Sequence, residues 1–258
     1  MRLTFLGTGT SFGIPQIGCG CAVCRSSDPR DRRSRSAAMV QANGRTILID
    51  TPPELRLQLI GAGVTDVDAV LYTHEHADHI NGIDDLRMFS SNHRRPLPIY
   101  GPAETLDRLR ASFNYIFDDA VEPYAGTSKP RLEPHPLEPG IPIDIGGVSV
   151  LPLAFAHGHL RVYGYRFGPV AYVTDVKSVP AAERALLAGI DVLGLNALWW
   201  RPHPTHLSID EAIETARAIG ARRTFLTHLT HETSHAELAA RLPAGIEPAY
   251  DGLTVEVP

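Results

Sequence analysis

The chain has 258 residues, of which 43% are hydrophobic and 21% are charged. These proportions are typical of a folded globular protein and exclude a disordered one. A chain of this length buries roughly 70–75% of its unfolded surface, so we expect a single domain over residues 1–258. The formal charge of −5 disfavours nucleic acid as a partner.

The sequence contains no apolar run of the about 18 residues that a transmembrane helix needs. Residues 1–7 are too short and too soon interrupted by glycine for a signal peptide, and they predict a strand. All three cysteines lie within residues 19–24, which argues against a disulfide framework. We therefore expect a cytoplasmic protein without a membrane partner.

In chain order, the first half predicts strands separated by loops and helices. Asn43-Gly44 is a strong turn dipeptide and joins two of the strands into a hairpin. The proline-rich segment 123–142 is predicted to be irregular. The predicted strands are 2–6, 37–42, 46–49 and 68–72, a glycine-rich loop covers about 7–35, and the predicted helices are 52–62, 83–89 and 103–117.

The second half again alternates strands with helices. Ser208 and Glu211 have the spacing of a capping box, which predicts a helix over 208–219. Because strands and helices are grouped in each half, we expect packed sheets with helices outside. The other predicted elements are strands at 148–155, 162–167, 170–174, 191–195 and 223–227, a helix at 180–187, and two short closing segments.

A histidine cluster follows the predicted strand 68–72. The segment Thr73-His74-Glu75-His76-Ala77-Asp78-His79 has the pattern H-x-H-x-D-H. Imidazole and carboxylate groups are the usual ligands of zinc and similar divalent ions. Four ligands so close together are too many for one open catalytic site, which indicates two metal ions.

This motif resembles that of the metallo-β-lactamase superfamily. The resemblance implies an α+β fold, a four-layer αββα sandwich, with a dinuclear metal site at one edge of the sheets. Further ligand candidates follow predicted strands in the expected order. By the resemblance, one metal site comprises His74, His76 and His157, the other comprises Asp78, His79 and His228, and Asp175 bridges them.

The cysteines form a second candidate metal site, with the spacing C-x-C-x-x-C at Cys19, Cys21 and Cys24. Three thiolates can occupy three corners of a zinc tetrahedron, and the fourth ligand is expected to be histidine. His231 is the first candidate and His235 the alternative. Four protein ligands leave no open position, so this Zn²⁺ would be structural.

The cysteine loop narrows the resemblance. Gly7-Thr8-Gly9-Thr10, Gly13-Ile14-Pro15 and the three cysteines resemble the PhnP-type branch, whose type member is a phosphoribosyl 1,2-cyclic phosphate phosphodiesterase. The likeness runs from residue 1 to about 235. It implies a homodimer and two active-site divalent ions, Zn²⁺ or Mn²⁺.

The resemblance implies a phosphodiesterase acting on a small cyclic phosphate, of the phosphoribosyl 1,2-cyclic phosphate or 2′,3′-cyclic nucleotide type. Zinc lowers the pKa of bound water to about 7, which makes hydroxide available for attack on phosphorus. His206, before the helix at 208–219, resembles the branch's catalytic histidine and is expected to protonate the leaving group; His203 competes for this role. Asp78 is the other candidate catalytic residue.

Other functions remain open. A tRNA 3′-processing endonuclease shares the ligands, but residues 87–123 are too short and acidic for a tRNA-gripping arm, and Ala77 stands where that family usually has glycine. A thioester hydrolase of the glyoxalase II kind lacks the cysteine loop. A metal-binding scaffold without activity would be expected to lack ligands. Residues 123–142, His93, His135, His159 and the pair Trp199-Trp200 have no assigned role.

Overall fold

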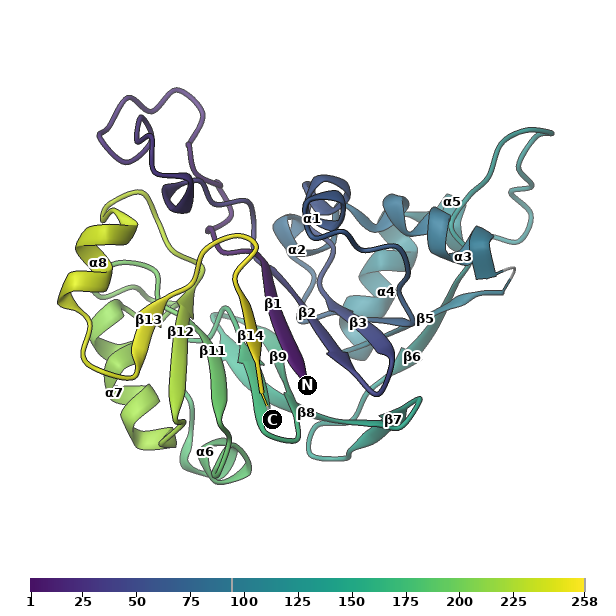
Figure 1. Ribbon diagram of the computed structural model, residues 1–258. Helices are drawn as coiled ribbons and strands as arrows, with labels where there is room; N and C mark the ends of the chain where they lie inside the picture. Colours follow the sequence, from purple (N-terminus) through teal and green to yellow (C-terminus); the bar gives the residue numbers. More distant parts are fainter. Residues whose placement is uncertain (94, 258) are drawn as a thin grey trace.

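The computed structural model describes residues 1–93 and 95–257. Two seven-stranded sheets pack face to face, and helices cover both outer faces (Figure 1), as the αββα prediction required. The first sheet has the order β14 (Thr254–Glu256), β1 (Arg2–Gly7), β2 (Ala37–Ala42), β3 (Arg45–Ile49), β4 (Ala69–Leu71), β5 (Leu97–Gly101) and β6 (Leu132–Pro136). The second has the order β13 (Ile246–Pro248), β12 (Arg223–Thr227), β11 (Val192–Asn196), β10 (Val170–Val173), β9 (Leu160–Phe167), β8 (Val148–His157) and β7 (Ile143–Ile145).

The helices fall into two groups by the sheet that they cover. Within the part of the chain that the structure describes, none is long and apolar enough to cross a lipid bilayer. The first sheet is covered by α1 (Leu55–Gly61), α2 (Ala77–Ile80), the 3₁₀ turn η2 (Ile83–Leu86), α3 (Arg87–His93), α4 (Ala103–Ser112) and α5 (Asn114–Phe117). The second is covered by α6 (Ala181–Leu186), α7 (Ile209–Ile219) and α8 (His235–Arg241), and a 3₁₀ turn η1 (Pro29–Asp31) lies in the N-terminal loop.

Three apolar clusters correspond to the three contacts between four layers. The central cluster joins the two sheets and includes Phe5, Tyr165 and Phe225, all fully buried. The other two lie between each sheet and its helices. Alternating apolar residues on the strands therefore bury one face centrally and the other under helices, which explains the apolar strands of the sequence.

Each sheet is antiparallel on one side and parallel on the other. Strands β3, β4, β5 and β6 run parallel in the first sheet, and β10, β11, β12 and β13 run parallel in the second. The carboxyl ends of parallel strands meet at one edge of a sheet. Polar residues that follow these strands are therefore gathered at the same edge of the sandwich.

Several local predictions were confirmed. Asn43 and Gly44 both have positive φ, 52° and 71°, as a two-residue hairpin turn requires. The capping box at Ser208 and Glu211 is present at the start of α7. The structure also has β5, β7 and α8, which the sequence pattern did not separate.

Two predictions were wrong. The helix expected over 103–117 is divided into α4 and α5, because Phe113 leaves the helical region with φ −123° and ψ 45°. The segment 123–142 is not irregular throughout, since it contains β6 with Pro134 and Pro136. Proline is tolerated there because β6 is an edge strand, which needs ladder hydrogen bonds on one side only.

The loop between β1 and β2 rises above the sandwich and returns to it (Figure 1, purple). The Asp251 carboxylate holds both ends of this loop, because it accepts hydrogen bonds from the backbone N–H and hydroxyl of Thr8, at 2.9 and 2.7 Å, and of Ser34, both at 2.6 Å. The buried Arg33 guanidinium donates to the Ala249 carbonyl at 2.5 Å. The loop is thus fixed to the C-terminal part of the chain.

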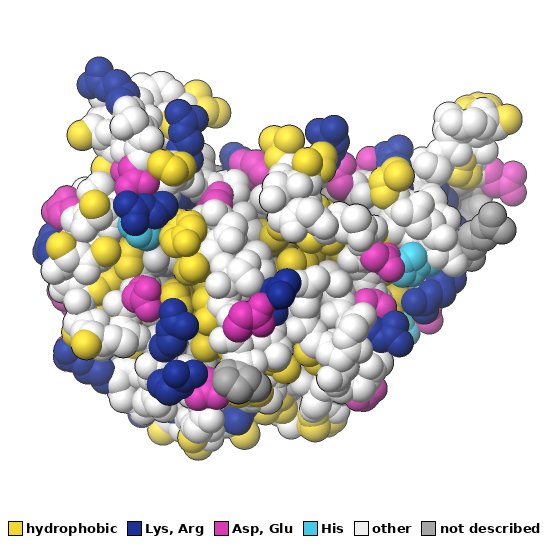
Figure 2. All heavy atoms as spheres, in the orientation of Figure 1, with side chains coloured by type: hydrophobic (Ala, Val, Ile, Leu, Met, Phe, Trp, Pro, Cys, Tyr) yellow, Lys and Arg dark blue, Asp and Glu magenta, His cyan; other side chains and the backbone are white. Residues whose placement is uncertain are grey.

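The surface shown in Figure 2 carries both signs of charge interspersed. Of the arginines in the loop, Arg30 pairs with Asp28 at 2.8 Å and Arg35 pairs with Glu54. These two arginines therefore contribute to the structure of the loop itself.

We expect Asp251→Ala to destabilise the fold by about 2–4 kcal/mol, because four donors, two of them backbone N–H groups, would lose their acceptor. Denaturant unfolding measures this change. Asp251→Asn keeps one acceptor oxygen and should lose less. Equal unfolding midpoints for the Asp251→Ala variant and the unaltered protein would contradict the anchoring role.

Candidate functional site

The seven predicted active-site ligands meet at the edge where the parallel strands end. Each follows the carboxyl end of a strand or belongs to the short helix behind it. His74 and His76 follow β4, Asp78 and His79 lie in α2, His157 ends β8, Asp175 follows β10 and His228 follows β12. The potential ligand atoms fall into overlapping groups whose members lie within 4.8 Å of one another: His74, His76 and His157; His74, His79 and Asp175; Asp78, His79 and His228.

The first group consists of three imidazoles. His74 Nε2 lies 2.9 Å from His76 Nδ1. The His157 ring lies across from both, with centroid distances of 5.3 Å to His74 and 5.2 Å to His76. The three rings therefore converge on a common space, as expected for ligands of one ion.

Asp175 lies between the two groups. Its Oδ2 is 3.4 Å from His79 Nε2, which is also 3.4 Å from Asp78 Oδ2. Its Oδ1 is 2.8 Å from His228 Nε2. His79 and His228 both belong to the second group. Toward the first group, ligand oxygens of Asp175 lie within 4.8 Å of those ring nitrogens of His74 and of His157 that could bind a metal. One carboxylate thus reaches both groups, which is the position expected of a bridging ligand.

Hydrogen bonds behind the rings fix which nitrogen faces the cluster. His79 Nδ1 donates to Asp50 Oδ2 at 2.7 Å, and His157 Nδ1 donates to the Thr205 carbonyl at 3.1 Å. The Thr73 hydroxyl donates to Asp50 at 2.8 Å, so it accepts from His74 Nδ1 at 3.0 Å. In all three rings Nε2 is turned inward, the arrangement that metal-binding histidines use. In His74 and His157, whose pKa values burial lowers, this Nε2 is also unprotonated.

Burial and charge show that the cluster needs a cation. Burial lowers the pKa of His74 and that of His228, the latter to about 4, so these rings are neutral and able to act as ligands. For Asp175 burial opposes ionisation, yet the rings of His228 and His79 hold the pKa of its carboxyl well below the usual range. Burial also opposes protonation of His79, yet the carboxylates of Asp78, Asp175 and Asp50 raise the pKa of its ring well above the usual value. The buried carboxylates thus draw a positive charge onto His79, at the position where a divalent cation would supply it.

Unpartnered ring nitrogens support the same conclusion. His79 Nε2 and both nitrogens of His228 are buried, and among residues 1–93 and 95–257 none of them makes a hydrogen bond of good geometry, although carboxylate oxygens lie 2.8–3.4 Å from the two Nε2 atoms. Such atoms are costly in a folded protein unless a ligand satisfies them. The donor set and these unsatisfied atoms therefore fit divalent metal ions.

The backbone is strained at the same place. Of the described residues other than glycine, four have positive φ, and three of them are Asp50 (66°), Asp175 (59°) and His228 (58°). Such conformations cost on the order of 1–3 kcal/mol each and tend to cluster at functional sites. In the turn after each strand, the positive φ orients the side chain of Asp50, Asp175 or His228 toward the site, and this orientation costs backbone strain.

A cleft of 580 Å³ opens above the cluster. His206 lies in its wall, with Nε2 3.0 Å from Asp175 Oδ1 and Nδ1 2.9 Å from the Thr205 hydroxyl. His203 Nδ1 lies 3.1 Å from His206 Nδ1, on the side away from Asp175. His206 is therefore close to the predicted metal ligands, and His203 stands behind it.

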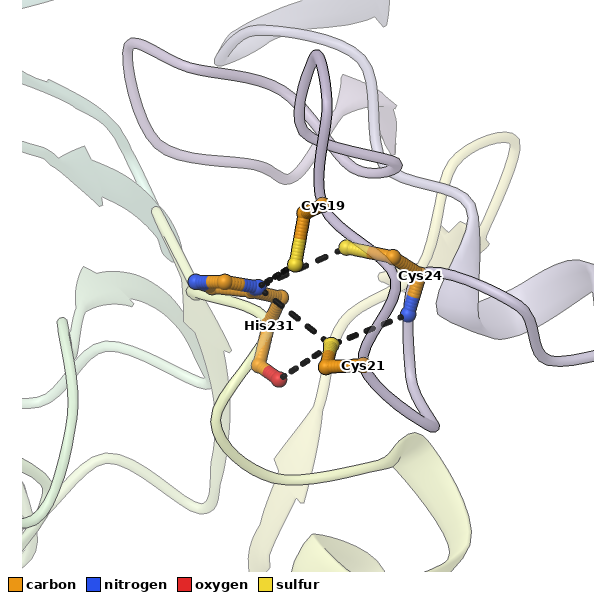
Figure 3. Close-up of side chains that lie close together, drawn as sticks. All are labelled: Cys19, Cys21, Cys24 and His231. Carbon is orange, nitrogen blue, oxygen red and sulfur yellow. Dashed lines mark hydrogen bonds between the residues drawn. The ribbon is translucent and has the colours of Figure 1, made fainter.

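The cysteine loop forms the second predicted cluster. His231 Nδ1 lies 3.3 Å from Cys19 Sγ and 3.4 Å from the Sγ atoms of Cys21 and Cys24 (Figure 3). The Cys24 N–H donates to Cys21 Sγ at 3.4 Å, and this contact lowers the pKa of Cys21 to about 6. A thiol with this pKa is largely a thiolate at neutral pH, the form that binds zinc.

His235, the alternative to His231, lies elsewhere. Its Nδ1 is 3.4 Å from Arg33, its ring packs edge-on against Tyr250 at 5.6 Å, and its backbone N–H donates to Asp31 at 2.6 Å. The structure thus brings His231 and not His235 to the cysteines.

The sequence analysis missed the residues that orient the ligands. Asp50 is fully buried and also accepts from the Thr73 N–H at 2.7 Å. Its signal was present, since it follows a strand as the ligands do. Among the unassigned histidines, His93 contacts Asp66, His135 stacks on Tyr100 with a centroid distance of 5.0 Å, and the exposed His159 lines the cleft.

The similarity to known proteins agrees with this geometry. A model described as the Beta-lactamase superfamily domain matches residues 45–229. An Octanoyltransferase of Porphyromonas gingivalis is 40% identical over 98% of this chain, which spans only 51% of that protein. A Ribonuclease Z of Mycobacterium sp. is 28% identical, and the match covers 100% of this chain and 96% of that protein.

Among solved structures, a diphosphatase from the PhnP family has 43% sequence identity and a TM-score of 0.91. The match covers 99% of this chain and 97% of that protein. Fold, strand-end ligands and sequence identity over the whole length agree, and the chain therefore belongs to the Beta-lactamase superfamily and, within it, to the PhnP family of metallo-hydrolases.

Proposed function

We propose that the protein is a dinuclear metal-dependent hydrolase that cleaves a phosphorus–oxygen bond in a small phosphodiester. The observation that carries this proposal is the position of Asp175 between two groups of histidines beneath a 580 Å³ cleft. A cleft of this size suits a small molecule. Its wall contains His206, a group that can move a proton.

In this proposal His74, His76 and His157 would hold one divalent ion, Asp78, His79 and His228 would hold the other, and Asp175 is placed to serve both. When bound, such ions lower the pKa of water and stabilise negative charge on a phosphoryl oxygen. Asp50, Thr73 and the Thr205 carbonyl keep the ligand rings in the required orientation. Zinc and manganese both suit this set of nitrogen and oxygen donors.

His206 is assigned as the proton donor. Water would add its oxygen to phosphorus and lose a proton to the Asp78 carboxylate, while the bond from phosphorus to the leaving oxygen breaks. A His206 ring that carries protons on both nitrogens would give its Nε2 proton to the leaving oxygen and keep the proton on Nδ1. Asp175 accepts this N–H at 3.0 Å and so orients it at the floor of the cleft. Asp78, which lines the cleft, is assigned a second role as acceptor of a hydrogen bond from the attacking water.

The leaving group separates two substrate classes. In a cyclic phosphate ester it is a sugar alkoxide, a strong base that needs the proton from His206. In a diphosphate it is a phosphate, which leaves with less help. The 43% identity to a PhnP-family diphosphatase favours testing this second class, whereas the likeness to Ribonuclease Z is weaker at 28%.

We further propose that Cys19, Cys21, Cys24 and His231 hold one structural Zn²⁺. The four ligand atoms lie within 4.8 Å of one another, and together they complete a tetrahedral set. The ion would link the loop after β1 to the segment after β12, which also supplies His228.

We expect His206→Ala to lower kcat about 10²–10⁴-fold on a nucleoside 2′,3′-cyclic phosphate, because the leaving alkoxide loses its proton donor. The loss should be smaller on a diphosphate diester. His203→Ala should cost less than about tenfold, since His203 touches only the far nitrogen of His206. Steady-state kinetics on metal-replete protein, with pre-tRNA and a glutathione thioester as comparison substrates, measures these effects.

Bound metal should be unchanged in both variants. Activity of His206→Ala equal to that of the unaltered protein would remove His206 from the mechanism. Turnover of only pre-tRNA or the thioester would contradict the proposed substrate.

We expect His231→Gln to lower the zinc content by about one ion per chain and to lower the melting temperature, because three thiolates remain without their fourth partner. His235→Gln is the matched control and should keep the zinc content, since His235 lies outside the cluster. Elemental analysis and thermal unfolding check both. The reverse pattern would make His235 the ligand.

A further inference from the structure

A second pocket adjoins the cleft above the predicted metal centre. It has a volume of 330 Å³ and lies between the loop after β1 and the segment after β11. Ser11 and His206 line both spaces, so the pocket opens at the residue assigned as proton donor. A substrate whose phosphorus lies near His206 can therefore extend a further group into this pocket.

Two aromatic side chains line the pocket, Phe12 and Trp199, together with the buried Ile14 and Leu198. Phe12 is 63% exposed, and it is not part of the three apolar clusters of the described residues. Trp199 is half-buried, and the His203 ring packs edge-on to it at 5.3 Å. Aromatic walls beside a phosphoryl site favour a planar, apolar-faced ligand.

The backbone holds Phe12 in this exposed position. Phe12 is in a tight turn that the Gly13 N–H closes by donating to the Thr10 carbonyl at 2.9 Å, and Gly13 has φ of +66°. Backbone hydrogen bonds fix the turn on both sides. The Thr10 N–H donates to the Leu229 carbonyl at 3.1 Å, and the Ile14 N–H donates to the Arg33 carbonyl at 2.7 Å. The exposed ring is thus preorganised rather than carried on a free loop.

Polar groups lie at the pocket wall as well. Gln16 lines it, and among the hydrogen bonds of the described chain none involves its side-chain amide. Glu232 lines it too, with its carboxylate paired to Arg201. An amide that can both donate and accept suits the edge of a heterocycle that carries ring nitrogens and exocyclic groups.

We propose that this pocket, formed by Phe12, Trp199 and Gln16, binds the base of a nucleotide substrate while its phosphate lies in the cleft at His206. The inference deepens the proposed function and rests on it for the position of the phosphate. It makes the substrate a nucleotide rather than a sugar phosphate without a base. Phe12 then determines specificity and has no part in the chemical step.

Calorimetric titration of the metal-replete protein with AMP and with ribose 5-phosphate tests the base pocket directly. AMP should bind about tenfold or more tightly, the effect of one stacked base. Phe12→Ala should abolish most of this preference and Phe12→Tyr should retain it. Ile17→Ala is the matched control, because Ile17 is 96% exposed on the same loop but does not line the pocket.

Equal affinity for the two ligands, or a preference that survives in Phe12→Ala, would overturn the inference. Turnover separates it from the proposed function. Adenosine 2′,3′-cyclic phosphate should have a kcat/KM about tenfold above that of methyl riboside 2,3-cyclic phosphate, again through Phe12. A base preference in binding without turnover of any phosphodiester would leave the pocket standing and refute the proposed reaction.

Discussion

The buried carboxylate of Asp50 is the contact on which the rest of the site depends. It lies at the end of β3 and accepts three hydrogen bonds, from the backbone and hydroxyl of Thr73 and from the ring of His79. Through Thr73 it also fixes the tautomer of His74. One side chain that touches no substrate thus orients ligands on both sides of Asp175, and its own burial prevents water from replacing it.

The sandwich gives this arrangement its rigidity. The proposed ligands follow strands that pack against apolar clusters on both faces of the sheet. The stability of this packing offsets the backbone strain at Asp50, Asp175 and His228. Short turns after rigid strands leave the side chains little freedom. The loops that surround the cleft lie outside these apolar clusters, and such loops can generally vary in sequence without disturbing the scaffold.

How far the sequence could predict this structure differs by feature. The histidine and aspartate cluster was predictable because H-x-H-x-D-H is local, and the family resemblance pointed to the remaining members, each of which follows an apolar strand. Asp50 also follows an apolar strand, but it was not recognised because it is not among the ligands that the family resemblance implies. The contact of His231 with cysteines more than 200 residues away was one of two alternatives in the sequence. The choice between His231 and His235 depends on how the cysteine loop packs against the C-terminal segment, which the sequence alone does not show.

Other features were beyond local reasoning for physical reasons. The prolines of β6 contradict a strand unless the strand is known to lie at an edge, which depends on sheet order. The pocket lined by Phe12 and Trp199 forms where two loops that are far apart in the sequence come together. Pattern and propensity describe each loop separately and cannot show that they share a cavity.

The pairing of β1 with β14 has a consequence for the order in which the protein can fold. β1 is made first, but its partner on one side spans residues 254–256, and the Asp251 that anchors the cysteine loop is also near the end. While the chain is being synthesised, that edge of β1 stays open, and an open strand edge is a template for wrong pairing. All the proposed metal ligands have been synthesised by residue 231, yet the edge is closed and the loop fixed only by the residues that follow.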